Sequence, residues 1–225
     1  MTWRQPVFAA VGLLLFAQGV LRADLEFEAV AIHLEQNATE NDAEIVIDVT
    51  SGDVGMASLK VVAPDGRTIV DFKSPDSKFG LRHFAVETPE PKNDGRLQKD
   101  FPEGEYTFTA TTLKGVKLTS KAELSHKMPE IVASFKPAAD AKDVPTKGLQ
   151  ITWSGVKNLK GYIVTVEQEE SGHEIKATLP STATTFSVPD GFLTPGTEYK
   201  VSIGTVAENG NMSFVEADFT TAGKK

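Results

Sequence analysis

Apolar and polar residues alternate along most of this chain. Apolar side chains occupy every second position in residues 45–49, 149–153, 162–166 and 199–203. An alternation of period two is typical of strands that bury one face. Val, Ile, Thr and aromatic residues dominate these runs, as strands prefer. No stretch after the first two dozen residues has the spacing of an amphipathic helix, so the pattern predicts an all-β protein.

Turn signals separate the alternating runs at short intervals. They are Pro64-Asp65-Gly66, Asn93-Asp94-Gly95, Pro195-Gly196 and Asn209-Gly210. Short strands with regularly spaced turns indicate a β-sandwich or a barrel. The pair Asn209-Gly210 favours a two-residue type I′ turn.

The first 23 residues have the layout of a secretory signal peptide. Arg4 precedes an apolar run over residues 7–17, and small residues follow it. The run is shorter than the ~20 residues that a membrane span needs. We expect cleavage after Gly19 or Ala23, and an uncleaved N-terminal anchor is the alternative.

Net charge and cysteine content limit which cellular compartment and which classes of partner we expect. The formal net charge is −8, and the leader holds Arg4 and Arg22 but no acid, so the mature chain is more acidic still. An acidic surface repels phosphate backbones and anionic membranes, which excludes nucleic acid as an expected partner. The chain has no cysteine, so each core must hold without disulfides. A cysteine-free exported chain points to a secreted or periplasmic protein of bacterial origin.

The composition of residues 125–131, SHKMPEI, marks a domain boundary at Met128 and Pro129. A closing hairpin precedes it, and a fresh strand pattern follows. We therefore predict a first domain over 24–128, a second over 129–222 and a short tail at 223–225. Each part has about the length of a seven-stranded sandwich.

Landmarks of the second part occur in a distinctive order. LQITWSGV (149–156) and GYIVTVEQ (161–168) come first, and TTFSVP (184–189), LTPGTEYKVSIGTV (193–206) and FVEADFTTA (214–222) follow. In this order the part resembles a fibronectin type III domain. The resemblance implies a β-sandwich whose core includes Trp153, Tyr162, Phe186, Leu193 and Tyr199. It also implies a spacer or binding module. The Arg-Gly-Asp tripeptide of an adhesive family member has no counterpart in the loop AENGNMS (207–213).

Tyr199 follows a Pro-Gly turn and opens an alternating run. In β-sandwiches a tyrosine at this place returns its hydroxyl to upstream backbone, forming a tyrosine corner. Leu193 would be the apolar plug beneath that connection. The ring is then buried without an orphaned polar group.

The first part resembles immunoglobulin-like sandwiches of exported bacterial proteins. It has strand-like runs in EIVIDVT (44–50) and ASLKVVAPDGRTIVDF (57–72), and FPEGEYTFTATT (101–112) places Tyr106 where a second tyrosine corner would lie. A jelly roll or another sandwich topology would give the same pattern.

The segment from Lys73 to Lys99 is poorly patterned and interrupted by prolines. Loops of this length are commonly functional or disordered. Its residues Phe79, Arg82, His83 and Phe84 form the candidate partner-binding loop. The alternative is a loop that packs on its own domain and buries Phe84.

No catalytic, cofactor-binding or metal-binding set stands out. The four histidines are widely separated, and no pair has metal-ligand spacing. Glu40, Asp42 and Glu44 lie close together, as do Asp140 and Asp143, but neither group has the glycine turn of a calcium loop. We expect these acids to lie at solvated loop ends, and we expect no enzyme activity and no cofactor.

Three functions fit these observations. The leading hypothesis is an exported, non-catalytic binding or scaffolding protein that presents loops or sheet edges to a protein or glycan partner. The second is an accessory or catalytic component acting on extracellular polymers, which predicts a cleft between the domains lined by carboxylates. The third is an envelope assembly factor that adds a client strand to an exposed sheet edge.

Overall fold

The protein is described by a computed structural model that covers residues 26–74, 76, 78–92 and 95–223. The predicted leader, residues 1–23, lies outside the described residues. Within them the regular secondary structure is strand apart from one five-residue helix, α1 (Arg96–Asp100), in the stretch without clear patterning. The prediction of an all-β protein is confirmed.

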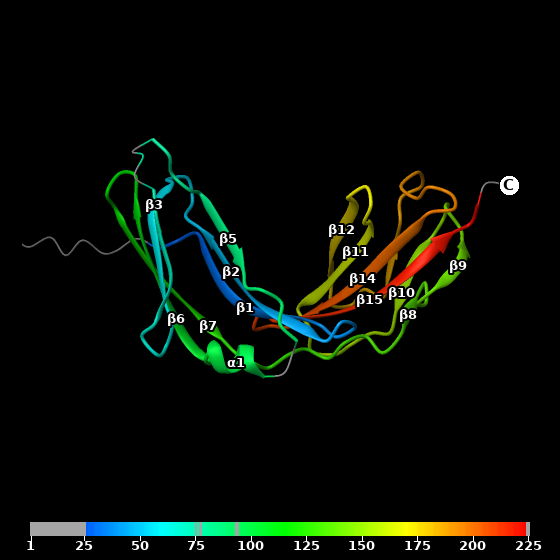
Figure 1. Ribbon diagram of the computed structural model, residues 1–225, viewed down its shortest axis with the longest axis horizontal. Coiled ribbons are helices and arrows are strands. Elements are labelled where there is room, and N and C mark those ends of the chain that lie inside the picture. The colour runs from blue at the N-terminus through cyan, green and yellow to red at the C-terminus, as the bar shows by residue number, and fades with distance from the viewer. Residues whose placement is uncertain (1–25, 75, 77, 93–94, 224–225) are drawn as a thin grey trace, which may run out of the picture.

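The N-terminal half forms a sandwich of two facing sheets (Figure 1). One sheet contains β1 (Ala29–Asn37), β2 (Asp42–Thr50) and β5 (His83–Glu87). The other contains β3 (Met56–Val62), β4 (Thr68–Lys73), β6 (Gly104–Thr112) and β7 (Lys117–Leu124) in the order β4-β3-β6-β7. This is the arrangement of an immunoglobulin-like sandwich, in which β4 and β7 are the edges of one sheet and β5 ends the other.

The C-terminal half repeats the plan. Its small sheet contains β8 (Phe135–Lys136), β10 (Gln150–Trp153) and β13 (Thr185–Ser187). Its large sheet contains β11 (Gly161–Gln168), β12 (His173–Pro180), β14 (Glu198–Val206) and β15 (Met212–Thr221) in the order β12-β11-β14-β15. A short strand, β9 (Ala141–Val144), pairs parallel with β15.

The two halves share one sheet. β15 pairs parallel with β1, from Glu35 opposite Met212 to Asn37 opposite Phe214. This pairing joins β5-β2-β1 to β15-β14-β11-β12 in a single eight-stranded sheet that includes β9. The sequence patterns predict two tandem sandwiches but no hydrogen-bonded ladder between them. In Figure 1 the two halves rise on either side of this junction and leave a concave side between them.

Asn211 fastens the junction from its fully buried position. Its Oδ1 accepts a hydrogen bond from the Leu34 amide at 2.9 Å. Its Nδ2 donates to the carbonyl oxygens of Ser125 at 2.6 Å and Lys127 at 3.1 Å. One amide side chain thus satisfies backbone groups of the first sandwich and of the segment that connects the halves.

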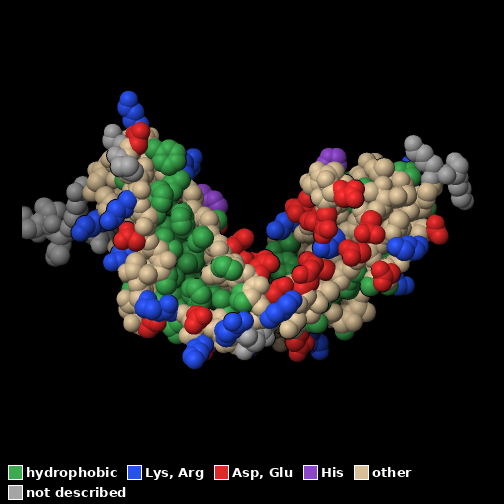
Figure 2. All heavy atoms as spheres, viewed as in Figure 1, with side chains coloured by type: hydrophobic (Ala, Val, Ile, Leu, Met, Phe, Trp, Pro, Cys, Tyr) green, Lys and Arg blue, Asp and Glu red, His purple; other side chains and the backbone are tan. Residues whose placement is uncertain are grey.

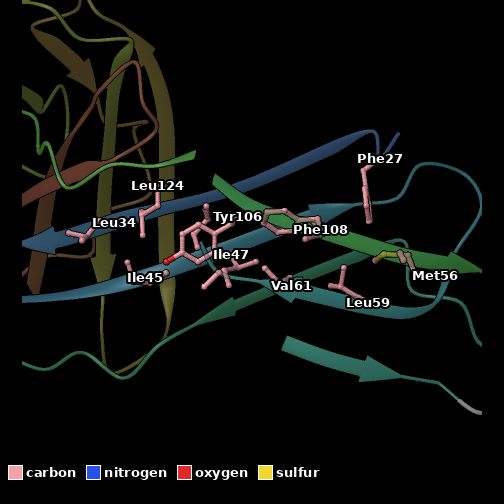
Figure 3. Close-up of a cluster of buried hydrophobic side chains, with 14 of the residues drawn as sticks. Phe27, Leu34, Ile45, Ile47, Met56, Leu59, Val61, Tyr106, Phe108 and Leu124 are labelled. Atoms are coloured by element: carbon pink, nitrogen blue, oxygen red, sulfur yellow. The ribbon is translucent and has the colours of Figure 1, made fainter. Parts of the chain in front are cut away.

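Each sandwich has its own core. The first core gathers buried residues between Phe27 and Leu124, with Tyr106 and Phe108 fully enclosed (Figure 3). The second gathers buried residues between Val132 and Phe219. The predicted boundary at Met128 and Pro129 falls between the two cores.

Both tyrosines expected at corners return their hydroxyl groups to upstream backbone. The Tyr199 hydroxyl accepts from the Thr194 amide at 2.9 Å and lies 3.5 Å from the Phe192 carbonyl oxygen. The Tyr106 hydroxyl donates to the Pro102 carbonyl oxygen at 3.1 Å. The connections before β6 and β14 are therefore tied down in a similar way.

The turn at Asn209-Gly210 differs from the predicted type I′ turn. Only Gly210 takes the left-handed conformation, with φ of 89°. The Gly210 amide donates to the Ala207 carbonyl oxygen, and the Ala207 amide donates to the Asn211 carbonyl oxygen. This is a three-residue connection with glycine at the left-handed position. The longer turn aims the Asn209 side chain at the Lys127 carbonyl oxygen, 3.0 Å away.

Candidate functional site

A hollow of about 350 Å³ lies on the concave side, over the junction of the two halves. Eight acidic residues line it: Glu35, Glu40, Asp42, Glu44, Glu90, Glu167, Glu174 and Glu216. Among its lining residues Lys200 is the one basic side chain. Figure 2 shows acidic side chains gathered on both sides of this concavity.

Strand alternation places these acids on one face. On β1, Leu34 enters the first core and Glu35 points to the opposite face. On β2, Ile45 enters the same core and Glu44 lies directly opposite Glu35 in the ladder. In the second half, Glu167 pairs with Lys200 and Glu216 pairs with Ser202. Because the sheet is continuous, carboxylates from residues far apart in the chain share one surface.

Repulsion and burial act together on Glu44. Partial burial, followed by the charges of Glu87, Glu35, Glu90 and Asp42, raises the pKa of Glu44 to about 7. The hollow therefore holds a carboxyl group that carries a proton for much of its time near neutral pH. It also concentrates negative potential, since several carboxylates face a partly enclosed space.

The lysine in the hollow is already engaged. Lys200 forms an ion pair with Glu169, and this contact raises the pKa of Lys200 above its usual value. Lys200 therefore neutralises a carboxylate at the rim rather than the group around Glu44.

The floor of the hollow includes an aromatic ring. Phe214 on β15 is half-buried and lies opposite Gly204 on β14. A Cβ at position 204 would collide with the Phe214 ring, so the absent side chain makes room for it. An aromatic ring that covers a cross-strand glycine protects a bare stretch of sheet.

The four residues of the predicted partner-binding loop lie near or on β5, away from the lining of the hollow. Phe79 is 56% exposed. The Arg82 guanidinium contacts Asp53 at 3.1 Å, and His83 Nε2 lies 2.7 Å from an Asp48 carboxylate oxygen. Phe84 is half-buried, with its ring centroid 6.1 Å from that of Phe72.

The predicted core residues of the second half occupy its interior. Trp153, Tyr162, Leu193 and Tyr199 are buried, and Phe186 is half-buried against the same core. The Trp153 and Tyr162 rings lie with centroids 5.4 Å apart.

The acids that the sequence places at solvated loop ends need a correction. Asp42 is buried and Glu44 half-buried, both lie on β2, and both line the hollow. Their partners Glu167, Glu174 and Glu216 lie more than a hundred residues away, and no local spacing links them. The one sequence signal for this cluster is the strand alternation, which places these acids on the face of the sheet away from the core.

Among the described residues, no group of three or more His, Asp or Glu side chains has the geometry to hold a metal ion. In the same part of the chain, no helix is long and apolar enough to cross a membrane.

The family model described as "Fibronectin type III domain" matches residues 137–217. A search of curated protein sequences gives no match. Among solved structures, the chicken CNTN1 FN1–FN3 domains are 14% identical, with a TM-score of 0.33, and the match covers 81% of this chain and 63% of that one.

Two further structures match over similar spans. A two-domain fibronectin type III segment of chicken tenascin is 16% identical, with a TM-score of 0.32 and coverage of 86% of this chain and 98% of the other. The Clostridium thermocellum CbhA fibronectin(III)-like modules are 12% identical, with a TM-score of 0.34 and coverage of 87% and 95%. The family model and the strand order of the second sandwich agree, so residues 137–217 are similar to a fibronectin type III domain.

Proposed function

We propose that this chain is an exported, non-catalytic binding or scaffolding protein of the bacterial periplasm or extracellular space. Fibronectin type III domains are often extracellular modules that bind proteins or act as scaffolds. The partner is a protein, and a cationic segment of it occupies the carboxylate-lined hollow at the junction.

The observation that carries this proposal is the gathering of eight carboxylates in one hollow on a continuous sheet. Each carboxylate is costly to hold near the others, as the raised pKa of Glu44 indicates. A cationic partner would relieve that repulsion and would associate faster through electrostatic steering. Glycan-binding sites commonly stack sugar rings on aromatic side chains. Phe214 is the one aromatic residue in this lining, so the hollow suits a cationic protein segment better than a glycan.

Affinity capture from the envelope fraction tests the proposal. The bait is the purified chain, alongside a variant with Glu35→Gln, Glu44→Gln and Glu216→Gln. A partner of the hollow is retained by the native chain, lost from the variant, and released as salt screens the contact. Equal capture by both baits, or capture that is insensitive to salt, would overturn the proposal. Capture of a glycan in place of a protein would assign the second partner class.

A second candidate is favoured by the same hollow. The hypothesis of a component acting on extracellular polymers predicts a carboxylate-lined cleft between the halves. A carboxyl group with a pKa near 7 beside several other acidic side chains can serve as a proton donor at neutral pH. Incubation with chromogenic polysaccharide substrates separates the two candidates. Hydrolysis that is abolished by Glu44→Gln would favour catalysis, and inactivity of the native chain on all substrates would favour binding.

A further inference from the structure

The strand β5 ends the eight-stranded sheet at the first sandwich, and no strand of the described residues pairs with its outer edge. The Ser51 amide donates to the Arg82 carbonyl oxygen, and the Thr88 amide donates to the Ile45 carbonyl oxygen. These two bonds show which residues of β5 are hydrogen-bonded to β2. Bonds of an antiparallel pair recur at every second residue. Phe84 and Val86 therefore bond to β2, and the backbone groups of His83, Ala85 and Glu87 point away from it.

The side chains of β5 that point toward the core are apolar and incompletely covered. Phe84 lies opposite Val49 and Val86 opposite Ile47, and both partners are buried in the core. Val86 is nevertheless 39% exposed. The interior of the sandwich is thus accessible along β5.

The facing edge strand has the same character. On β4, Val70 lies opposite Val61 and Phe72 opposite Leu59, so both point to the core, yet both are only half-buried. The strands β4 and β5 belong to different sheets, and the Phe72 ring meets Phe84 between them. In Figure 2 a band of hydrophobic side chains runs down the first half in this region. The sandwich is open on the side where β4 and β5 face each other.

The outer face of the sheet at β5 carries Glu87 and the neighbouring Asp48, which contacts His83. Asp48 lies opposite Ala85, Glu87 is exposed beside it, and the carboxylates of the hollow continue along the sheet. None of the core-facing residues of β5 is charged, so the edge lacks the inward charge that commonly blocks strand pairing. Pro89 and Pro91, which lack a backbone N–H, follow β5 and limit the open edge to the strand itself.

We propose that the edge of β5 binds an extended segment of a partner protein in which basic and apolar side chains alternate. The segment pairs with His83, Ala85 and Glu87 through its backbone. Its apolar side chains cover Val86 and Phe84, and its basic side chains lie on the acidic outer face. Addition of a strand to a sheet edge is an established mode of peptide recognition.

Two other occupants or places fit less well. A second copy of this chain would bring two acidic faces together, and its formal charge of −8 opposes that. The opposite edge of the sheet, β12, has its core-facing Ile175 and Leu179 packed against the second core. An added strand would therefore gain less apolar contact there.

Fluorescence anisotropy tests the proposal with a labelled synthetic peptide of about seven residues in which Lys and Val alternate, long enough to span the five residues of β5 and extend past both ends. We expect the full chain to bind it, and to bind a Glu–Val peptide at least about tenfold more weakly. Ala85→Pro removes an N–H that points to the open edge but not a bond to β2. Val86→Lys places a charge in the apolar opening. Each substitution is expected to weaken binding at least about tenfold.

The matched control is Ile131→Lys, since Ile131 is 40% exposed but lies in the connecting segment. It should bind the Lys–Val peptide as the native chain does. If Ala85→Pro fails to fold, Val86→Lys still decides the question because it keeps every backbone bond. No binding by the native chain, equal binding of the Glu–Val peptide, or unchanged binding by Val86→Lys would overturn the proposal. A dimer in sedimentation that Ala85→Pro abolishes would assign the edge to a second copy.

The proposal is independent of the function assigned to the hollow. The variant with Glu35→Gln, Glu44→Gln and Glu216→Gln leaves the backbone of β5 and its apolar opening intact. It should retain most of its peptide binding even if capture of the natural partner is lost.

Discussion

At the scale of single residues, Glu44 shows how the fold alters the chemistry of an ordinary side chain. It lies directly opposite Glu35 in the ladder between β1 and β2, and like charges in that position destabilise a sheet. The pKa of Glu44 is about 7, against 4.5 for the unperturbed side chain. The folded state therefore binds this proton more tightly than the unfolded chain does.

This shift fixes how stability depends on pH. Below about pH 4.5 Glu44 is protonated in both states and costs nothing. As pH rises from there to about 7, the unfolded state loses its proton first, so the free energy of unfolding falls. Above about pH 7 both states are ionised, and the full destabilisation by the Glu44 charge is present. Glu44→Gln should therefore stabilise the chain at pH 8 by about 1 kcal/mol, after allowance for solvent screening, and change little at pH 4.5. Urea unfolding at both pH values measures this, and an equal effect at both would contradict it.

Tyr199 shows a second residue-scale effect, in which a hydroxyl satisfies buried backbone. Tyr199→Phe keeps the ring and its stacked contact with Phe219, whose centroid is 5.8 Å away, but leaves the Thr194 amide without its acceptor. We expect a loss of about 1–2 kcal/mol in the free energy of unfolding. Denaturant unfolding followed by tryptophan fluorescence measures it. Unchanged stability would mean that water replaces the hydroxyl.

At the scale of elements, the large sheet depends on close packing between neighbouring strands. Gly204 lies within β14, and its φ is not positive, so the backbone there does not require glycine. Its role is to leave space for the Phe214 ring. Phe214 in turn belongs to β15, the strand that joins the two halves.

We predict that Gly204→Ala displaces the Phe214 ring and lowers the free energy of unfolding by about 1–3 kcal/mol. Ser202→Ala, on the same face of the same strand, is the matched control and should change stability little. Unfolding curves for both variants provide the measurement. A neutral Gly204→Ala variant would show that the ring can turn aside without cost.

At the scale of the whole molecule, the junction decides whether two sandwiches behave as one unit. The Asn211 side-chain amide bonds to backbone groups of Leu34, Ser125 and Lys127. The Gln36 side-chain amide donates to the Ser213 hydroxyl at 2.8 Å. The Glu216 amide donates to the Thr39 hydroxyl at 2.9 Å. Side-chain bonds thus reinforce the short parallel ladder between β1 and β15.

We therefore predict that Asn211→Asp uncouples the halves. The substitution replaces a buried donor by an acceptor that faces two carbonyl oxygens, which should cost about 3 kcal/mol or more. Calorimetry should show one transition for the native chain and two for the variant, and small-angle scattering should show a larger radius of gyration for the variant. Glu208→Gln, at an exposed neighbour in the same turn, should leave one transition. A single transition in the Asn211→Asp variant would mean that the backbone ladder alone couples the halves.

Local patterns predicted much of the fold. Alternation located the strands, and the Pro-Gly-x-x-Tyr stretch placed Tyr199 at its corner, because both depend on contacts within a few residues or on one buried face. The turn at Asn209-Gly210 was wrong in type, since Asn211 must reach the junction and a longer connection allows it. The acids of β2 were predicted as solvated loop ends, because the strands that complete the hollow, β11 and β15, lie more than a hundred residues away.

The alternation in the sequence by itself determined that this chain forms pleated layers, and its aromatic and turn residues determined how the second sandwich closes. Only the tertiary structure decided that β1 and β15 pair, that eight carboxylates meet in one hollow, and that β5 keeps an apolar edge open. The physical reason is that alternation fixes which face of a strand is buried, whereas the neighbour of an edge strand is chosen by backbone groups that every residue carries alike.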